Sequence, residues 1–245
     1  MSIKPNERTD TTSLVRPRAL VVEDREREVC TQWVKFHHDW WDTELERLRL
    51  PGGPLRVRAR AEGDSLERRD VWALATDVES SDEAVLGLLW HALAWGAGTS
   101  LRMCRQRMAS VAADLPRGVD LLRRSAVLSR TDPEGAYGVL HPDGQGALRG
   151  LGPAFGTKFL YFAGGGLEQH PSLILDSLVA TTLHREGWAS LHIGGGWPAA
   201  TYSRYCDLAR RWATELAAES NAAVAADQVE KWLFTTARNA RNGQP

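Results

Sequence analysis

Two glycines separated by one apolar residue lie in the second half of the chain, between two stretches with helical spacing. They are Gly150 and Gly152, with Leu151 between them, and Pro153 follows at a position where proline commonly opens a helix. The glycines allow the chain to reverse within a few residues, and the leucine can anchor the turn between two helices. The segment therefore predicts a helix, a tight hairpin and a second helix, whose first amides are suited to bind a phosphate oxygen.

The rest of the chain also carries the apolar spacing of amphipathic helices. We expect a long helix over residues 23–50, an isolated short strand over 55–61 and a short helix over 65–77. Later helices are expected near residues 82–96, 102–108, 119–128, 177–185, 201–219 and 226–239, and a further one begins at residues 132–134. The pattern predicts an all-α fold, and the length suits either one large domain or two small helical lobes around a shared cleft. We expect a flexible N-terminus over 1–22, one helical domain over 23–241 and a loose tail over 242–245.

Composition excludes several classes of protein. No apolar run approaches the roughly 20 residues that span a bilayer, and the polar N-terminus does not resemble a signal peptide. We therefore expect a cytoplasmic protein without a membrane partner. Cys30, Cys104 and Cys206 lie far apart, which argues against a zinc site and against a disulfide framework.

The net charge of −1 gives no overall attraction to nucleic acid, but its distribution is uneven. Arginines dominate residues 102–130, where only Asp114 and Asp120 oppose them. Such a segment is either a solvated helix face or a surface for phosphates. The sequence leaves these two interpretations open.

The hairpin and the segment after it resemble the helix-hairpin-helix DNA glycosylases, nearest the 8-oxoguanine DNA glycosylase branch. The pattern of that superfamily is Leu-x-Gly-hydrophobic-Gly followed by a helix. A loop then leads to an apolar run that ends in an aspartate at the start of another helix. Here residues 164–166 are glycines, residues 173–175 are apolar, and Asp176 follows. The resemblance covers about residues 147–183 and implies the glycosylase fold, with Gly150, Leu151, Gly152 and Ala154 against DNA.

By this resemblance Asp176 is the catalytic carboxylate. Cleavage of an N-glycosidic bond builds positive charge on the deoxyribose, and a carboxylate near C1′ stabilises that charge and can activate a nucleophile. A helix N-terminus stabilises the anion. An isolated aspartate at such a position would otherwise serve only as a helix cap.

The lysine position departs from the pattern. Glycosylases that also nick the strand carry a lysine two residues beyond the second glycine, where this chain has Ala154. We therefore expect a monofunctional enzyme that leaves an abasic site. Lys158 lies one turn further along the predicted helix. If the hairpin is shifted, Lys158 instead forms a Schiff base or contacts DNA, and a plain surface lysine is a further alternative.

A glycosylase must hold the extruded base between aromatic or apolar walls. The candidates for that pocket are Trp95, Trp40, His37, His170 and Tyr202. Each of these side chains is also a reasonable core residue.

The leading hypothesis is a DNA glycosylase that acts on double-stranded DNA as a monomer. Its substrate is expected to be an oxidised purine of the 8-oxoguanine type, or a modified base of phage DNA, which would make the chain a defence protein. No cofactor is expected, with a monovalent cation at the hairpin left as an option. The alternatives are a non-catalytic helix-hairpin-helix DNA-binding protein and a helical scaffold without a role on DNA.

Overall fold

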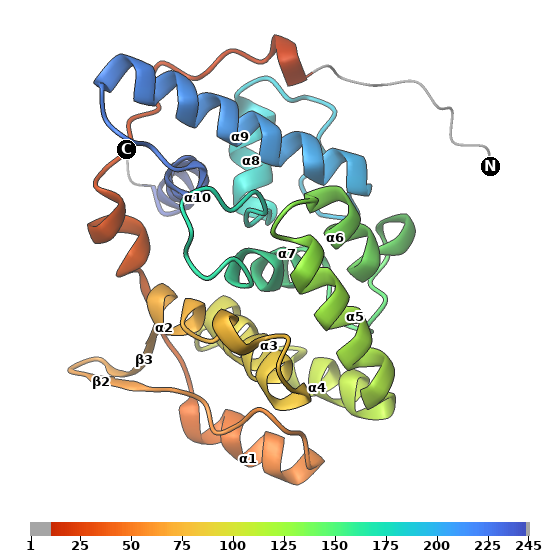
Figure 1. Cartoon of the computed structure of the whole chain (residues 1–245). Coiled ribbons are helices and arrows are strands. Elements are labelled where there is room, and N and C mark those ends of the chain that lie inside the picture. Colours follow the sequence, from red (N-terminus) through yellow and green to blue (C-terminus); the bar gives the residue numbers. More distant parts are fainter. Residues whose placement is uncertain (1–10, 244–245) are drawn as a thin grey trace.

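The computed structural model describes residues 11–243, and helices make up most of that range (Figure 1). The α-helices are α1 (His38–Leu48), α2 (Arg68–Trp72), α3 (Asp82–Ala97), α4 (Cys104–Ala113), α5 (Leu115–Leu128), α6 (Pro133–Leu140), α7 (Pro153–Phe162), α8 (Ser177–Arg185), α9 (Ala199–Ser220) and α10 (Ala226–Arg241). The expected all-α class is confirmed, with one small sheet added. None of the helices in the described part of the chain combines the length and hydropathy that crossing a bilayer requires.

The sheet has three short strands, β1 (Trp33–Lys35), β2 (Arg58–Arg60) and β3 (Gly63–Glu67). Their order is β1-β3-β2, and both pairings are antiparallel. The strand expected near residues 55–61 is therefore present but not isolated, because a tight turn returns the chain at once to pair as β3. In Figure 1 the β2–β3 hairpin extends away from the helices.

The single helix expected over residues 23–50 is wrong. The structure has a π-helical turn at Glu26–Cys30, then β1, then α1. Trp33 pairs with Glu67, and the Phe36 amide donates to the Asp64 carbonyl at 3.1 Å. Pairing with a distant strand thus overrides the local helical spacing of the aromatic residues, which suit a pleated surface equally well.

Several helices begin at a side-chain cap. The Ser81 hydroxyl accepts the Ala84 amide at 3.1 Å, and the Asp132 carboxylate accepts the Gly135 amide at 2.9 Å. Asp176 caps α8 in the same way, so the expected start of this helix at residue 177 is confirmed. Each side chain satisfies amides that the first helical turn leaves unpaired.

Helix α7 lies in the middle of the molecule (Figure 1). It packs against α3, which belongs to the end of the molecule that contains α1–α4 and the sheet. At the other end α10 packs against both α8 and α9. This arrangement brings α7 and the start of α8 between the two ends, where the candidate site lies.

At the ends of the chain, only part of the predicted flexible segments can be compared with the structure. Residues 1–10 and 244–245 lie outside the described range. From Thr11 onward the N-terminal segment is held against α9, because one Arg211 nitrogen donates to the carbonyls of Thr11 and Leu14 at 2.9 and 2.7 Å. Leu20 is also buried. The segment from residue 11 to residue 22 therefore packs against the domain predicted to begin at residue 23.

Candidate active site

Asp176 uses its two carboxylate oxygens for different purposes. Oδ1 accepts the amides of Leu178 and Val179 at 3.0 and 3.2 Å and so caps α8. Oδ2 lies 3.2 Å from the Lys158 ammonium nitrogen. Fixed amides therefore orient the carboxylate, while its second oxygen stays available to a cation or a reacting group.

Lys158 is not a surface residue. Its side chain is only 9% exposed, and Nζ also donates to the Ala154 carbonyl at 3.3 Å. Gly96 of α3 makes room for the lysine, because a Cβ atom at this position would lie 2.7 Å from Lys158 Cδ. The structure thus brings together the two residues predicted as catalytic, from α7 and from the start of α8.

Thr157 connects the two segments that carry this pair. Its hydroxyl donates to the Leu175 carbonyl at 3.0 Å and accepts the Leu175 amide at 3.1 Å. The bonds fix the residue before Asp176 directly to the residue before Lys158. Sequence reasoning missed this residue, since a threonine inside an apolar helix gives no sign of its distant partner.

A cavity of about 230 Å³ opens beside the pair. Asp176, Lys158 and Trp95 line it together with residues of β1, α2 and α10. Trp95 is therefore the predicted pocket residue that the structure places next to the catalytic pair. Its ring packs edge-on against Phe162, with the ring centroids 5.3 Å apart.

A buried ion pair lines the same cavity. Arg68 Nη2 donates to Glu230 Oε2 at 3.0 Å, and each side chain is 1% exposed. Arg68 Nη1 donates to the Tyr161 hydroxyl at 2.7 Å, which donates in turn to Asp227 at 3.1 Å. Burial raises the pKa of the Glu230 carboxyl. Sequence analysis missed this pair. The sequence did offer a sign, because Glu230 follows Val229 and occupies a position on the apolar face of the helix.

The hairpin differs from the prediction on its first side. Helix α6 ends at Leu140, and a 3₁₀ turn and irregular backbone lead to Gly150, so no helix directly precedes the turn. Pro142 and the positive φ of Gly144 (+75°) account for this break. The second side agrees, because α7 begins at Pro153 and Leu151 is buried.

Arg107 holds the turn in place. Its Nε donates to the Gly150 carbonyl at 2.9 Å, and its guanidinium lies 3.9 Å from the centre of the Phe155 ring. Gly150 has a φ of +83°, a left-handed conformation that glycine adopts without strain. Gly152 and Ala154 are half-buried at the start of α7.

The other predicted pocket residues lie elsewhere. His37 and Trp40 line a separate cavity of about 450 Å³, near the start of α1. His170 is buried and its Nε2 lies 2.9 Å from the Leu160 carbonyl oxygen. Tyr202 is buried, stacks on Tyr137 and donates to the Leu173 carbonyl at 2.8 Å. None of these four residues lines the cavity beside Asp176.

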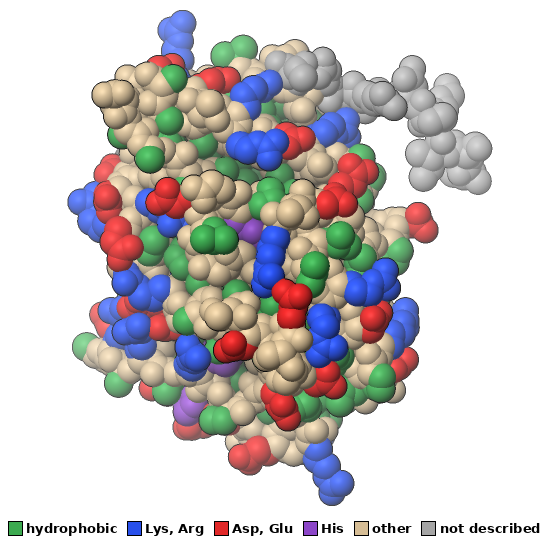
Figure 2. Space-filling view, in the orientation of Figure 1, with side chains coloured by type: hydrophobic (Ala, Val, Ile, Leu, Met, Phe, Trp, Pro, Cys, Tyr) green, Lys and Arg blue, Asp and Glu red, His purple; other side chains and the backbone are tan. Residues whose placement is uncertain are grey.

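The arginines of residues 102–130 are largely paired with carboxylates. Arg105 contacts Glu44, and the other pairs are Arg123–Asp82, Arg124–Asp120 and Arg130–Glu79. On the face shown in Figure 2, basic and acidic side chains are interspersed. Much of this segment is therefore a charge-balanced helix surface, which favours the first of its two interpretations.

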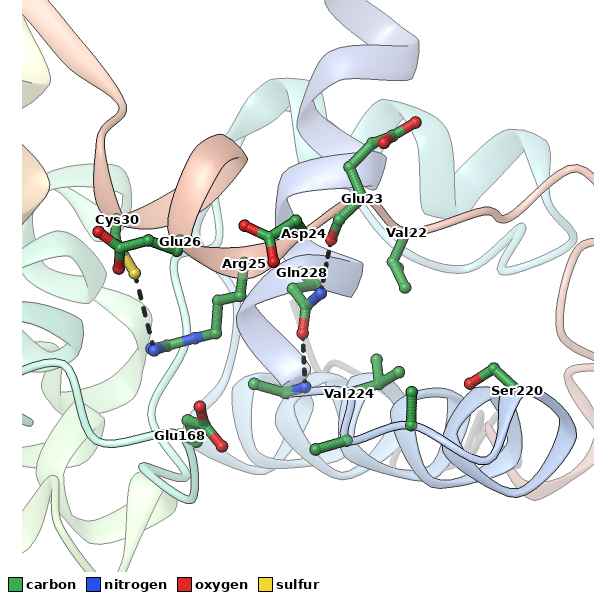
Figure 3. Close-up of a pocket in the computed structure, with 13 residues that line it drawn as sticks. Val22, Glu23, Asp24, Arg25, Glu26, Cys30, Glu168, Ser220, Val224 and Gln228 are labelled. Carbon is green, nitrogen blue, oxygen red and sulfur yellow. Dashed lines mark hydrogen bonds between the residues drawn. The ribbon is translucent and has the colours of Figure 1, made fainter.

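A larger cavity, of about 470 Å³, lies between the N-terminal segment and the start of α10 (Figure 3). The Gln228 side chain bridges this junction, since it donates to the Glu23 carbonyl at 2.7 Å and accepts the Ala225 amide at 2.8 Å. Glu23, Asp24, Glu26 and Glu168 line the cavity. Carboxylates repel phosphates, so this cavity is a poor place for DNA.

Comparison with known proteins gives one match. Residues 27–234 match the model of the family described as "Putative 8-oxoguanine DNA glycosylase OGG-like protein". No curated protein and no solved structure matches the chain. The matched range includes the hairpin, both members of the Lys158–Asp176 pair and the residues of the cavity beside them except Arg238. The chain therefore belongs to the OGG-like family of 8-oxoguanine DNA glycosylase-like proteins.

Proposed function

We propose that the chain is a DNA glycosylase that extrudes a damaged base from double-stranded DNA and cleaves its N-glycosidic bond, with Asp176 and Lys158 as the catalytic residues. The observation that carries the proposal is the 3.2 Å contact between Lys158 Nζ and Asp176 Oδ2 beside a cavity. Buried ion pairs contribute little net stability, so a structural role alone gives a weak reason for this one. The family description supports an oxidised purine as the substrate.

Asp176 stabilises the positive charge that develops on the sugar as the bond to the base breaks. Its Oδ1 is held by two backbone amides, so the carboxylate needs no reorganisation when the charge appears. The electron pair of the breaking bond leaves with the base, which then takes a proton. No cofactor is required for this step.

Lys158 is the nucleophile we propose for C1′, in place of water. The ammonium passes one proton to the departing base, the free amine attacks C1′ while Asp176 stays ionised, and opening of the sugar ring gives a Schiff base. The position of Ala154 led us to expect a monofunctional enzyme. Lys158, one turn later, has its amine against the catalytic carboxylate, which favours the Schiff-base alternative.

The hairpin is the proposed contact for DNA phosphate. Gly150, Leu151, Gly152 and Ala154 form the turn and the first residues of α7, where backbone amides and the helix dipole attract an anion. The same turn leads directly into the helix that carries Lys158. Binding of the backbone there sets the distance between the extruded nucleotide and the catalytic pair.

The test uses duplexes that each carry one candidate base: 8-oxoguanine, uracil, an alkylated purine or a phage-type modified cytosine. Strand breakage is measured with and without alkali, and covalent complexes are trapped with borohydride. We expect excision of 8-oxoguanine and a trapped complex with the wild-type protein. Lys158→Ala should abolish trapping, and Asp176→Asn should slow excision by on the order of a hundredfold or more while duplex binding persists.

Other results of this experiment would each indicate a different function. Alkali-dependent breakage without trapping would make water the nucleophile and the enzyme monofunctional. Binding without cleavage of any base would establish the non-catalytic DNA-binding protein instead. Lack of binding at low salt, where phosphate contacts are strongest, would exclude both functions on DNA.

A further inference from the structure

The Arg68–Glu230 ion pair lines the same cavity as Asp176 and Lys158, yet the proposed bond cleavage uses neither residue. Arg68 begins α2 and Glu230 lies in α10, so the pair joins elements from the two ends of the molecule. Glu230 Oε2 accepts from Arg68. Its Oε1 makes no hydrogen bond to any residue in the range 11–243, although it is not fully enclosed. One acceptor of this carboxylate is therefore unused.

Two donors at the same cavity are also unused. Arg68 Nε and the indole Nε1 of Trp95 are buried and have no hydrogen-bond partner within the described chain. The guanidinium carbon lies 5.0 Å from the centre of the Trp95 ring, so the two side chains are neighbours. Residues that line the cavity thus carry one acceptor and two donors without a partner in the described chain.

Such an arrangement opposes stability. A buried donor without a partner loses its hydrogen bonds to water and gains nothing in return. A buried ion pair is often replaced by apolar residues without loss, because desolvation offsets its attraction. The need for a stable fold therefore does not explain these polar groups, whereas a polar ligand that pairs with them does.

We propose that Arg68, Glu230 and Trp95 are specificity determinants that recognise the extruded base, and that they select bases with a ring N–H next to a carbonyl. This inference rests on the proposed function and names the part of the base that is recognised. Glu230 Oε1 accepts the ring N–H, and Arg68 and Trp95 donate to the carbonyl oxygen. Trp95 also supplies an aromatic face against which the base packs.

The chemistry of the pair favours this edge over an amino edge. A ring N–H beside a carbonyl is more acidic than an exocyclic amino group, so it bonds more strongly to a carboxylate. A carbonyl oxygen is likewise a strong acceptor for a guanidinium. 8-Oxoguanine has this arrangement on two edges, at N1–H with O6 and at N7–H with O8. Adenine has it on neither.

The experiment measures equilibrium binding, so that recognition is separated from cleavage. Two duplexes carry an uncleavable 2′-fluoro nucleotide at the same position, one with 8-oxoguanine and one with adenine as its base. We expect the wild-type protein to prefer 8-oxoguanine by about tenfold or more, as sites built to pair a polar edge do. In Glu230→Gln the preference should fall to about twofold or less, because the new amide adds a donor and removes the charge.

Glu44→Gln is the matched control. Glu44 is also a buried carboxylate held by arginines, Arg47 and Arg105, but it lies in α1 outside the cavity. This variant should retain the full preference for 8-oxoguanine. Loss of preference in both variants would reveal a general effect of removing a buried charge and would overturn the proposal.

Trp95→Phe keeps the experiment decisive if Glu230→Gln fails to fold. The indole N–H has no partner in the described chain, so Trp95→Phe breaks no internal hydrogen bond and keeps an aromatic ring at this position. We expect the preference for 8-oxoguanine to drop about threefold to tenfold, the effect of one hydrogen bond. An unchanged preference in Trp95→Phe overturns the proposal, whether or not Glu230→Gln folds.

The two proposals fail in different ways. A wild-type protein that prefers the 8-oxoguanine duplex but cleaves no candidate base would refute the glycosylase reaction and leave base recognition standing. A wild-type protein that cleaves, together with Glu230→Gln at full preference, would refute the recognition site alone. A wild-type protein with no preference between the two duplexes also refutes the recognition site.

Discussion

Gly96 of α3 lies directly against the side chain of Lys158. A Cβ atom built on Gly96 would lie 2.7 Å from Lys158 Cδ and 3.2 Å from Cε. Contacts this short require the lysine to move, and the lysine is held at Asp176 by a single 3.2 Å contact. The absence of a side chain at residue 96 therefore fixes the position of the proposed nucleophile.

Gly96→Ala should displace the lysine amine without removing it. Misplacement of a reacting group by about 1 Å costs on the order of a hundredfold in rate, so we expect a loss of trapped complex of that size. The rate is measured by borohydride trapping under single-turnover conditions. Gly138→Ala is the control, because a Cβ atom there meets Ala199 at an ordinary 3.9 Å. Equal trapping by both variants would contradict the positioning role of Gly96.

Asp176→Asn separates the two uses of this carboxylate. Asparagine caps helices as well as aspartate, so helix α8 should be preserved, while the Lys158 ammonium loses its counter-charge. The charge on the sugar is no longer stabilised, and excision should slow by on the order of a hundredfold or more. Asp132→Asn changes the cap of α6 in the same manner, far from the cavity, and should excise at the wild-type rate. Similar rates for the two variants would reduce Asp176 to a helix cap.

The candidate site shows what a sequence reveals and what it does not. Asp176 was predicted as the catalytic carboxylate and Lys158 as the alternative Schiff-base lysine, because both residues lie in one short segment with a spaced pattern. Arg68 and Glu230 were missed because they are separated by 162 positions and only the fold brings them together. A residue that acts through a distant partner leaves no local signal.

The fold shows the same division between local and distant causes. Helices that start with Ser81, Asp132 or Asp176 were predicted closely, because each cap acts within its own turn. The helix expected over residues 23–50 failed because β1 obtains its hydrogen bonds from β3, about thirty residues later. Aromatic spacing alone does not distinguish these two outcomes.

The two glycines of the hairpin should respond differently to alanine. Gly150 has a φ of +83°, so Gly150→Ala should lower the free energy of unfolding by about 1–2 kcal/mol. Gly152 has a φ of −74° and no atom within 4 Å of its would-be Cβ, so Gly152→Ala should fold normally. If DNA approaches this turn, the added methyl group at residue 152 weakens duplex binding. Denaturation and binding titrations check both effects, and normal binding by Gly152→Ala would place DNA elsewhere.

Buried histidines should make the protein less stable in mild acid. Burial lowers the pKa of His141 to about 4, and the pKa values of His91 and His170 are also lowered to about 4. The usual value is 6.5, so between pH 6.5 and 4 the unfolded chain binds more protons than the folded protein. The stability contributed by the neutral rings is complete above pH 6.5 and is lost as the pH falls toward 4.

His141→Phe tests this pH dependence most directly. Both ring nitrogens of His141 lack hydrogen-bond partners in the described structure, and the ring lies 4.6 Å from that of Tyr137, so an apolar ring suits the position. Removing one titrating group should reduce the pH dependence of the unfolding free energy by up to about 1.4 kcal/mol per pH unit between pH 4 and 6.5. Urea denaturation at a series of pH values measures the slope. A slope identical to that of the wild-type protein would show that His141 takes up no proton on unfolding.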